Sequence, residues 1–250
     1  MARYKSGNPV LSSGTFKGVE RASGQGAAMS RQGTVNKVVL MLLTLLATAS
    51  YLWLRFSQSL QYSDIAPLFY TGLIGGFGVA LVIVFRKQYA PQLALVYAAL
   101  EGLVLGGMSA FMEQRYPGIV SQALVLTFGT FAALLALYQS RVIKATENFK
   151  LMVLSATGGI AICYLLSLGL SFFGINLPMI HDNGLFGILF SLFVVGVAAM
   201  NLVLDFDFIE QGVAYGAPKY MEWYGAFGLM VTLVWLYVEM LRLLSKLRRR

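Results

Sequence analysis

Seven long apolar runs take up most of this chain and limit the folds that it can adopt. They cover residues at about 36–55, 66–85, 90–112, 118–139, 150–174, 184–206 and 222–245. About 20 mainly apolar residues cross the hydrocarbon core of a bilayer as an α-helix. Only 12% of the 250 residues are charged, against roughly 25% in an ordinary soluble domain. The sequence therefore predicts an all-α integral membrane protein, a bundle of seven transmembrane helices.

The domain organisation follows from where the apolar runs begin. Residues 1–34 are rich in Gly, Ser and Ala, carry scattered Lys and Arg, and have no apolar core of their own. That composition predicts a disordered N-terminal tail. The connections between later runs are short, so residues 35–250 form one transmembrane domain with no separate soluble domain.

The net charge of +8 bears on orientation rather than on nucleic acid. The basic residues cluster at the termini and in short connections, the pattern that faces anionic lipid headgroups. Six Lys and Arg lie in the N-terminal tail through Lys37, and the six successive connections hold one, two, one, three, none and one. The even connections hold more, which predicts a cytoplasmic N-terminus.

The C-terminus does not fit this orientation rule. Seven crossings place it outside, yet it is strongly basic. Its cations are Arg242, Lys246, Arg248, Arg249 and Arg250. Either this basic end is tolerated outside, or the last run returns to the cytoplasmic face. We favour seven crossings because the last run is long enough to span.

Carboxylates at membrane depth are the main candidates for function. A carboxylate at the centre of a spanning helix costs roughly 2.5 to 3.5 kcal/mol on insertion scales, so it needs a partner, a proton or a water-filled cavity. Glu101 lies near the middle of the third run, where it is either functional or a protonated acid that donates one hydrogen bond to a neighbouring helix.

A second acidic group ends the sixth run, with Asp205, Asp207 and Glu210 directly after an apolar stretch. On a helix, Asp205 and Asp207 project in nearly opposite directions, whereas Asp207 and Glu210 share a face. The alternative is that the helix ends before Asp205 and all three acids lie in water. In the last run, Glu239 stands three residues before Arg242, the spacing of a helical ion pair.

The residue pattern does not indicate an enzyme. Ser109 and His181 could serve an intramembrane serine protease, but His181 lies outside the apolar runs. Asp205 and Asp207 cannot face one another as the catalytic pair of an aspartyl protease. One Cys and one His do not indicate a zinc site of clustered ligands. We therefore expect no catalytic residues and no resident metal or cofactor.

Small residues predict where helices approach closely. Gly72 and Gly76 in the second run, and Gly102 and Gly106 in the third, are spaced at four. This spacing lets two helix backbones touch. Close packing of these two helices is the simpler interpretation, and a path lined by glycine is the alternative.

Four short motifs occur in order along the chain. They are Glu101-Gly102-Leu103, the stretch from Leu204 to Glu210, Glu222-Trp223-Tyr224, and the ending around Leu241-Arg242. Together they resemble the Bax inhibitor-1 (transmembrane Bax inhibitor motif) family over essentially the whole chain. The stretches Asn8 to Ser12 and Gln32 to Lys37 resemble a bacterial branch. The resemblance implies a seven-helix bundle with a central last helix, in a bacterial cytoplasmic membrane.

The resemblance also implies an activity, a passive calcium leak governed by protonation of two aspartates, one on each of the last two helices. Asp205 matches the first aspartate, but Thr232 stands where the second would be. We therefore expect a differently built switch, with Asp207, Glu101 as its cross-helix partner, and Arg86 as a counter-charge.

Two functions remain open at this point. The first is a pH-sensitive cation path in which calcium binds only transiently. Its gate residues are Asp205, Asp207 and Glu101, with Glu210, Thr232, Glu239 and Arg86 as auxiliary candidates. The second is a non-conducting membrane protein that modulates a membrane-anchored protease or another complex, with the N-terminal tail as a docking segment.

Overall fold

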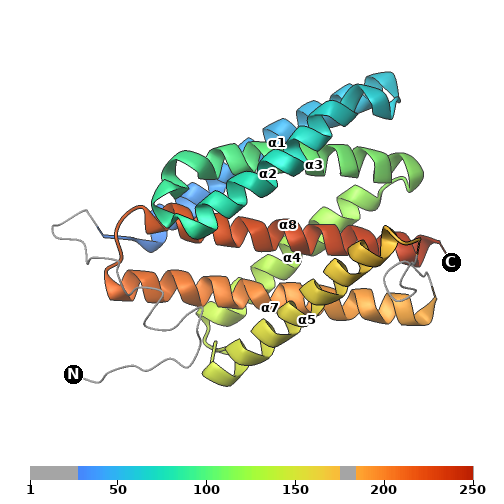
Figure 1. Cartoon of the computed structure of the whole chain (residues 1–250). Coiled ribbons are helices and arrows are strands. Elements are labelled where there is room, and N and C mark those ends of the chain that lie inside the picture. Colours follow the sequence, from blue (N-terminus) through green and yellow to red (C-terminus); the bar gives the residue numbers. More distant parts are fainter. Residues whose placement is uncertain (1–27, 175–183, 250) are drawn as a thin grey trace. The chain divides into compact units, whose positions relative to one another are not determined.

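Seven long helices make up most of the described chain (Figure 1). The computed structural model describes residues 28–174 and 184–249. Its helices are α1 (Arg31–Ser59), α2 (Tyr62–Phe85), α3 (Ala90–Arg115), α4 (Ile119–Gln139), α5 (Glu147–Ser171), α7 (Leu185–Tyr215) and α8 (Met221–Arg248), with a short 3-10 helix η1 (Lys87–Tyr89) before α3. All seven long helices are long and apolar enough to cross a membrane. The predicted all-α fold with seven spanning helices is confirmed.

Helix ends differ from the apolar runs where polar residues continue a helix. α7 passes through Asp205, Asp207 and Glu210 to Tyr215, well beyond the predicted end near residue 206. All three acids are therefore helical. α1 begins at Arg31, because the Ser30 hydroxyl caps it by accepting a hydrogen bond from Gly33 N at 3.0 Å. His181 and residues 1–27 of the predicted tail lie outside the described residues.

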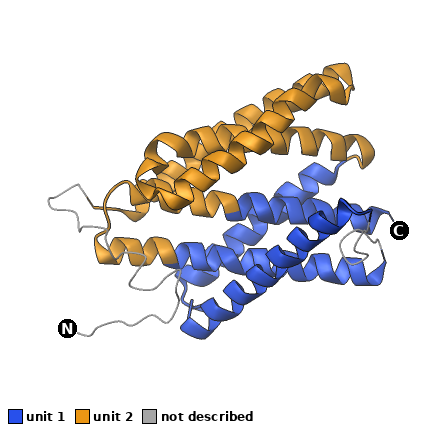
Figure 2. Cartoon of the chain, viewed as in Figure 1, with its two compact units in different colours: residues 1–17, 118–207, 232–250 blue, residues 18–117, 208–231 orange. Residues whose placement is uncertain are grey.

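The helices divide into two compact units, which Figure 2 distinguishes by colour. Within the described chain, unit 1 comprises residues 118–174, 184–207 and 232–249, and unit 2 comprises residues 28–117 and 208–231. α7 and α8 each contribute residues to both units.

Unit 2 is built around α3, which packs against both α1 and α2. A Cβ added at Gly72 of α2 would lie 2.6 Å from the Leu100 carbonyl oxygen of α3. A Cβ at Gly106 of α3 would lie 2.4 Å from the Ala49 carbonyl oxygen of α1. The predicted close packing of α2 and α3 is confirmed at Gly72. Gly102 and Gly106 of α3 instead lie against the backbone of α1.

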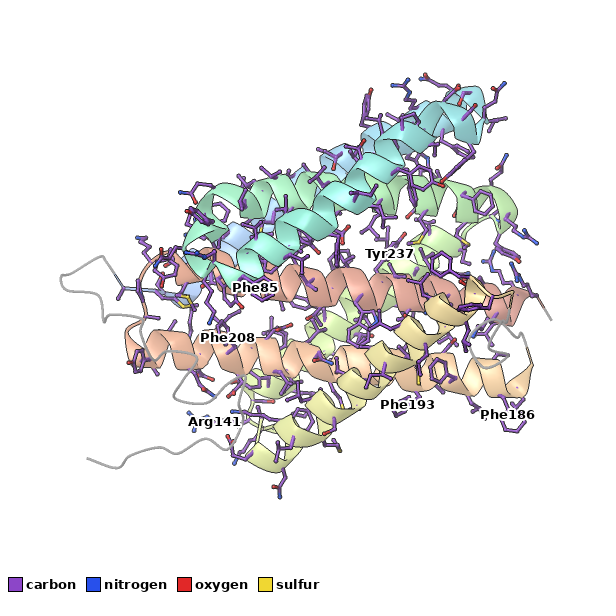
Figure 3. All side chains as sticks on the ribbon, viewed as in Figure 1. Phe85, Arg141, Phe186, Phe193, Phe208 and Tyr237 are labelled. Carbon is purple, nitrogen blue, oxygen red and sulfur yellow. The ribbon has the colours of Figure 1, made fainter. Side chains whose placement is uncertain are left out.

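Unit 1 has an apolar core shared by three helices. Ile160 of α5, Val194 and Val197 of α7 are buried together, and Trp235 of α8 packs against them. Other large apolar side chains point away from the protein. Phe186 is 79% exposed, and Figure 3 shows its side chain projecting from α7. Outward-facing apolar side chains are what a bilayer covers in a membrane protein.

The last helix is the most buried span described. An apolar stretch of 18 residues was compared in each helix: 56% of that stretch is buried in α8, against 17% in α2. Met230 and Leu236 are fully buried. A helix that buries most of its sides packs against neighbours around much of its circumference. The central position of the last helix stays a prediction.

Candidate functional site

Asp205 of α7 is held by a hydroxyl group of the last helix, α8. Within unit 1, the Asp205 carboxyl group is hydrogen-bonded to the hydroxyl of Thr232 on α8. Its Oδ2 is buried and has no hydrogen-bond partner among the described residues. An ionised carboxylate in this position is under-compensated, because burial removes water from an oxygen that gains no other donor. Asp205 can therefore take up a proton or attract a cation.

Asp207 lies two residues further along α7 and has a different partner. Its Oδ2 is 2.8 Å from Nζ of Lys150, on the first turns of α5. The Lys150 side chain is only 4% exposed, and Asp207 is 17% exposed. Glu147 is also 3.4 Å from Lys150 Nζ, and the Tyr138 hydroxyl donates to Asp207 Oδ1 at 3.5 Å. The result is a buried ion pair that ties α7 to α5.

The ion pair of Asp207 depends on a residue that the sequence pattern does not indicate. Lys150 marks the start of the fifth apolar run and resembles an ordinary interfacial lysine. Its spacing of three from Glu147 is the only local signal. The pairing with Asp207 joins segments far apart in the chain, so periodicity cannot reveal it.

Glu239 of α8 forms the ion pair predicted from its spacing. Arg242 Nη1 lies 2.8 Å from Glu239 Oε1, and the Tyr164 hydroxyl of α5 donates to the same oxygen at 3.0 Å. The Arg242 guanidinium lies 5.0 Å from the centre of the Tyr164 ring. Glu239 is fully compensated, which favours a structural role.

Glu101 of α3 and Arg86 lie in unit 2. Glu101 Oε1 accepts a hydrogen bond from the Tyr97 hydroxyl at 3.1 Å, one turn earlier on the same helix. Arg86 ends α2, and its backbone N–H donates to the Val82 carbonyl at 2.8 Å. Asp207 belongs to the other unit. The pairing of Glu101 with Asp207, and Arg86 as a counter-charge, therefore stay predictions.

Two further acids anchor the start of α1 within unit 2. Glu210 pairs with Arg31 at 2.6 Å, and both side chains are largely exposed. Glu222, on the first turn of α8, is fully buried. It accepts hydrogen bonds from Ser30 N at 3.0 Å and Ser30 Oγ at 2.9 Å, and it forms an ion pair with Lys37.

The sequence pattern does not single out Glu222, since an acid on the first turn of a helix already suits the helix dipole. Gly33 supplies the space for it, since a Cβ there would lie 2.2 Å from Glu222 Oε1. We call Ser30, Gly33, Lys37 and Glu222 the α1–α8 clamp.

These sites define a class of protein. In the described ranges, no group of three or more His, Cys, Asp or Glu side chains could hold a metal ion. The chain is an integral membrane protein in which helical carboxylates are held by cations and hydroxyls of neighbouring helices. Residues 8–249 match the profile of the family described as Bax inhibitor 1 like, and the chain belongs to this family. No curated protein matches the chain. The resemblance is confirmed, and the bacterial branch stays a prediction.

Proposed function

We propose that this protein is a passive, pH-sensitive cation path, with calcium as the transported ion. The main support is the environment of Asp205, a carboxylate within a spanning helix. Its Oδ2 is buried without a hydrogen-bond partner in the described chain. An intramembrane acid of this kind is a functional candidate by default. Carboxylate oxygens are the ligands that calcium prefers. We assign the cytoplasmic membrane of a bacterium, with a cytoplasmic N-terminus, as its setting.

The two aspartates take separate roles in this proposal. Asp205 supplies the charge that attracts the cation, with Thr232 fixing its orientation. In acid, protonation of Asp205 removes this charge and shifts the balance between conducting and closed states. The Asp207–Lys150 ion pair, faced also by Glu147 and Tyr138, holds α5 to α7 and favours the closed state.

Removing the charge of Asp205 should lower calcium flux. In liposomes that contain the purified protein and a calcium indicator, Asp205→Asn is expected to reduce flux about tenfold, corresponding to about 1.4 kcal/mol of cation binding. The matched control is Thr127→Val, which removes a buried hydroxyl of α4 with no hydrogen-bond partner in the described part of the chain and should leave flux unchanged. Wild-type flux in Asp205→Asn at both acid and neutral pH would exclude Asp205 from this role.

Removing the cation of Lys150 should raise calcium flux. Lys150→Met keeps the aliphatic length but cannot pair with Asp207, so α5 is held less firmly to α7 and flux at neutral pH should exceed that of the wild type. The control is Lys144→Met, which changes an exposed lysine in the connection before α5. A Lys150→Met protein that folds and keeps the wild-type flux would contradict this role of the ion pair.

The flux assay also distinguishes the cation path from the alternative function. If the folded wild-type protein carries no calcium at either pH, a role in modulating a membrane-anchored protease becomes the better account. Deletion of residues 2–27, followed by co-purification of the partner, then tests docking by the tail.

A further inference from the structure

A shallow apolar groove lies between α4 and α8 in unit 1. It has a volume of about 350 Å³ and is lined by Ser121, Gln122, Val125 and Leu126 of α4 and Leu244 of α8. Val125 is 72% exposed and Leu126 is 44% exposed. Both helices are long enough to span the membrane. The groove therefore opens toward the side of the helices that lipid chains cover.

The cationic side chain of Arg248 lies at one end of this groove. Arg248 Nη2 donates to the Gln122 side-chain oxygen at 3.1 Å. The same nitrogen is 3.8 Å from the position of a Cβ at Gly118, the residue before α4. The guanidinium of Arg248 is thereby placed beside the first turns of α4, where the apolar lining gives way to Ser121 and Gln122.

The sequence at this end is basic. Arg248 is followed by Arg249 and Arg250, and neither residues 118–146 nor residues 240–250 contain an Asp or Glu. Two further C-terminal cations lie deeper in the protein, since Arg242 pairs with Glu239 and Lys246 Nζ donates to the Gly187 carbonyl at 2.9 Å. The Arg248 side chain, bonded to Gln122, is exposed beside the groove.

We propose that the groove binds one anionic phospholipid. Its acyl chain lies along Val125, Leu126 and Leu244, and its phosphate group lies at the guanidinium of Arg248. A guanidinium matches the geometry of phosphate oxygens through paired N–H donors, and the cationic end disfavours the quaternary ammonium of a choline headgroup. A bound lipid contacts both α4 and α8, so its binding stabilises the packing of unit 1.

This site also explains the basic C-terminus that the orientation rule leaves unexplained. Cations near a membrane surface attract anionic lipids on whichever side they lie. Arg248 would then serve lipid binding, and its charge would not indicate that the C-terminus lies on the cytoplasmic side.

Native mass spectrometry with two lipids tests the proposal. Full-length protein is equilibrated with phosphatidylglycerol or phosphatidylcholine of identical acyl chains. We expect one phosphatidylglycerol to be retained about tenfold better than phosphatidylcholine. Arg248→Gln should remove the preference, and Leu244→Trp should lower retention of both lipids by filling the groove. Val125→Trp, at a more exposed position, replaces Leu244→Trp if that variant does not fold.

Matched controls separate this groove from the general charge of the protein. Arg55→Gln removes an exposed arginine of α1, and Ile74→Trp enlarges an exposed side chain of α2. Both should retain phosphatidylglycerol as the wild type does. Equal retention of the two lipids, an unchanged preference in Arg248→Gln, or an equal loss in Arg55→Gln would overturn the site. Full displacement by inorganic phosphate would indicate a soluble anion instead of a lipid.

Discussion

Replacing Glu222 with alanine is expected to lower the free energy of unfolding by about 3–5 kcal/mol. Glu222 is fully buried, and Lys37 is only 16% exposed, so the substitution leaves a poorly hydrated ammonium group without its counter-charge. Ser30 also loses the acceptor of its backbone N–H and its hydroxyl. The measurement is unfolding in mixed micelles of increasing denaturing detergent, followed by tryptophan fluorescence.

Glu210→Ala is the matched control for the α1–α8 clamp. It also removes an acid that pairs with a basic residue near the start of α1, but Arg31 and Glu210 are 68% and 46% exposed. Breaking an exposed pair costs about 0–1 kcal/mol. The double variant Lys37→Met with Glu222→Leu should recover much of the lost stability, because the isolated charge is gone. Equal effects of Glu222→Ala and Glu210→Ala would show that burial of the clamp contributes nothing.

The number of spanning helices follows from sequence because hydropathy is a local property. Each apolar run carries its own signal, whatever packs against it. The end of α7 does not follow in the same way. Its charged residues Asp207 and Glu210 suggest an end, but Lys150 and Arg31 neutralise them from remote parts of the chain. The helix can therefore continue to Tyr215.

The same difference between local and remote contacts decides which site residues could be predicted from the sequence. The Glu239–Arg242 pair could be predicted because both residues lie on one helix at a spacing of three. Thr232 could be aligned with the second aspartate of the family, and it does bond to Asp205. Lys150 and the α1–α8 clamp could not be predicted, since their contacts join different helices. A single sequence contains no signal for which faces of two helices meet.

The glycines show how far spacing alone can be taken. A spacing of four predicts that Gly102 and Gly106 lie at a helix contact, which they do. It does not say which helix approaches. α1 packs there with its backbone at Leu45 and Ala49, so the contact is set by tertiary structure.

Gly106→Ala is therefore expected to destabilise the protein by about 1–3 kcal/mol, the usual cost of overpacking. The added methyl group would lie 2.4 Å from the Ala49 carbonyl oxygen and 2.7 Å from its Cα. Both atoms belong to the backbone of α1, so no side chain can rotate to make room. The helices α1 and α3 must move apart, and the contacts along their interface weaken. Detergent unfolding monitored by tryptophan fluorescence measures the loss.

Gly78→Ala is the control with the opposite expected sign. Gly78 lies within α2, and a Cβ there would have no atom of the described residues within 4 Å apart from the neighbouring backbone of its own helix. Alanine in place of an uncrowded helical glycine stabilises by about 0.4–1 kcal/mol, because the unfolded chain loses conformational freedom. The two substitutions add the same methyl group, so a difference in sign isolates the contact between α1 and α3. If both variants gain stability, the two helix backbones do not approach as closely as Gly106 indicates.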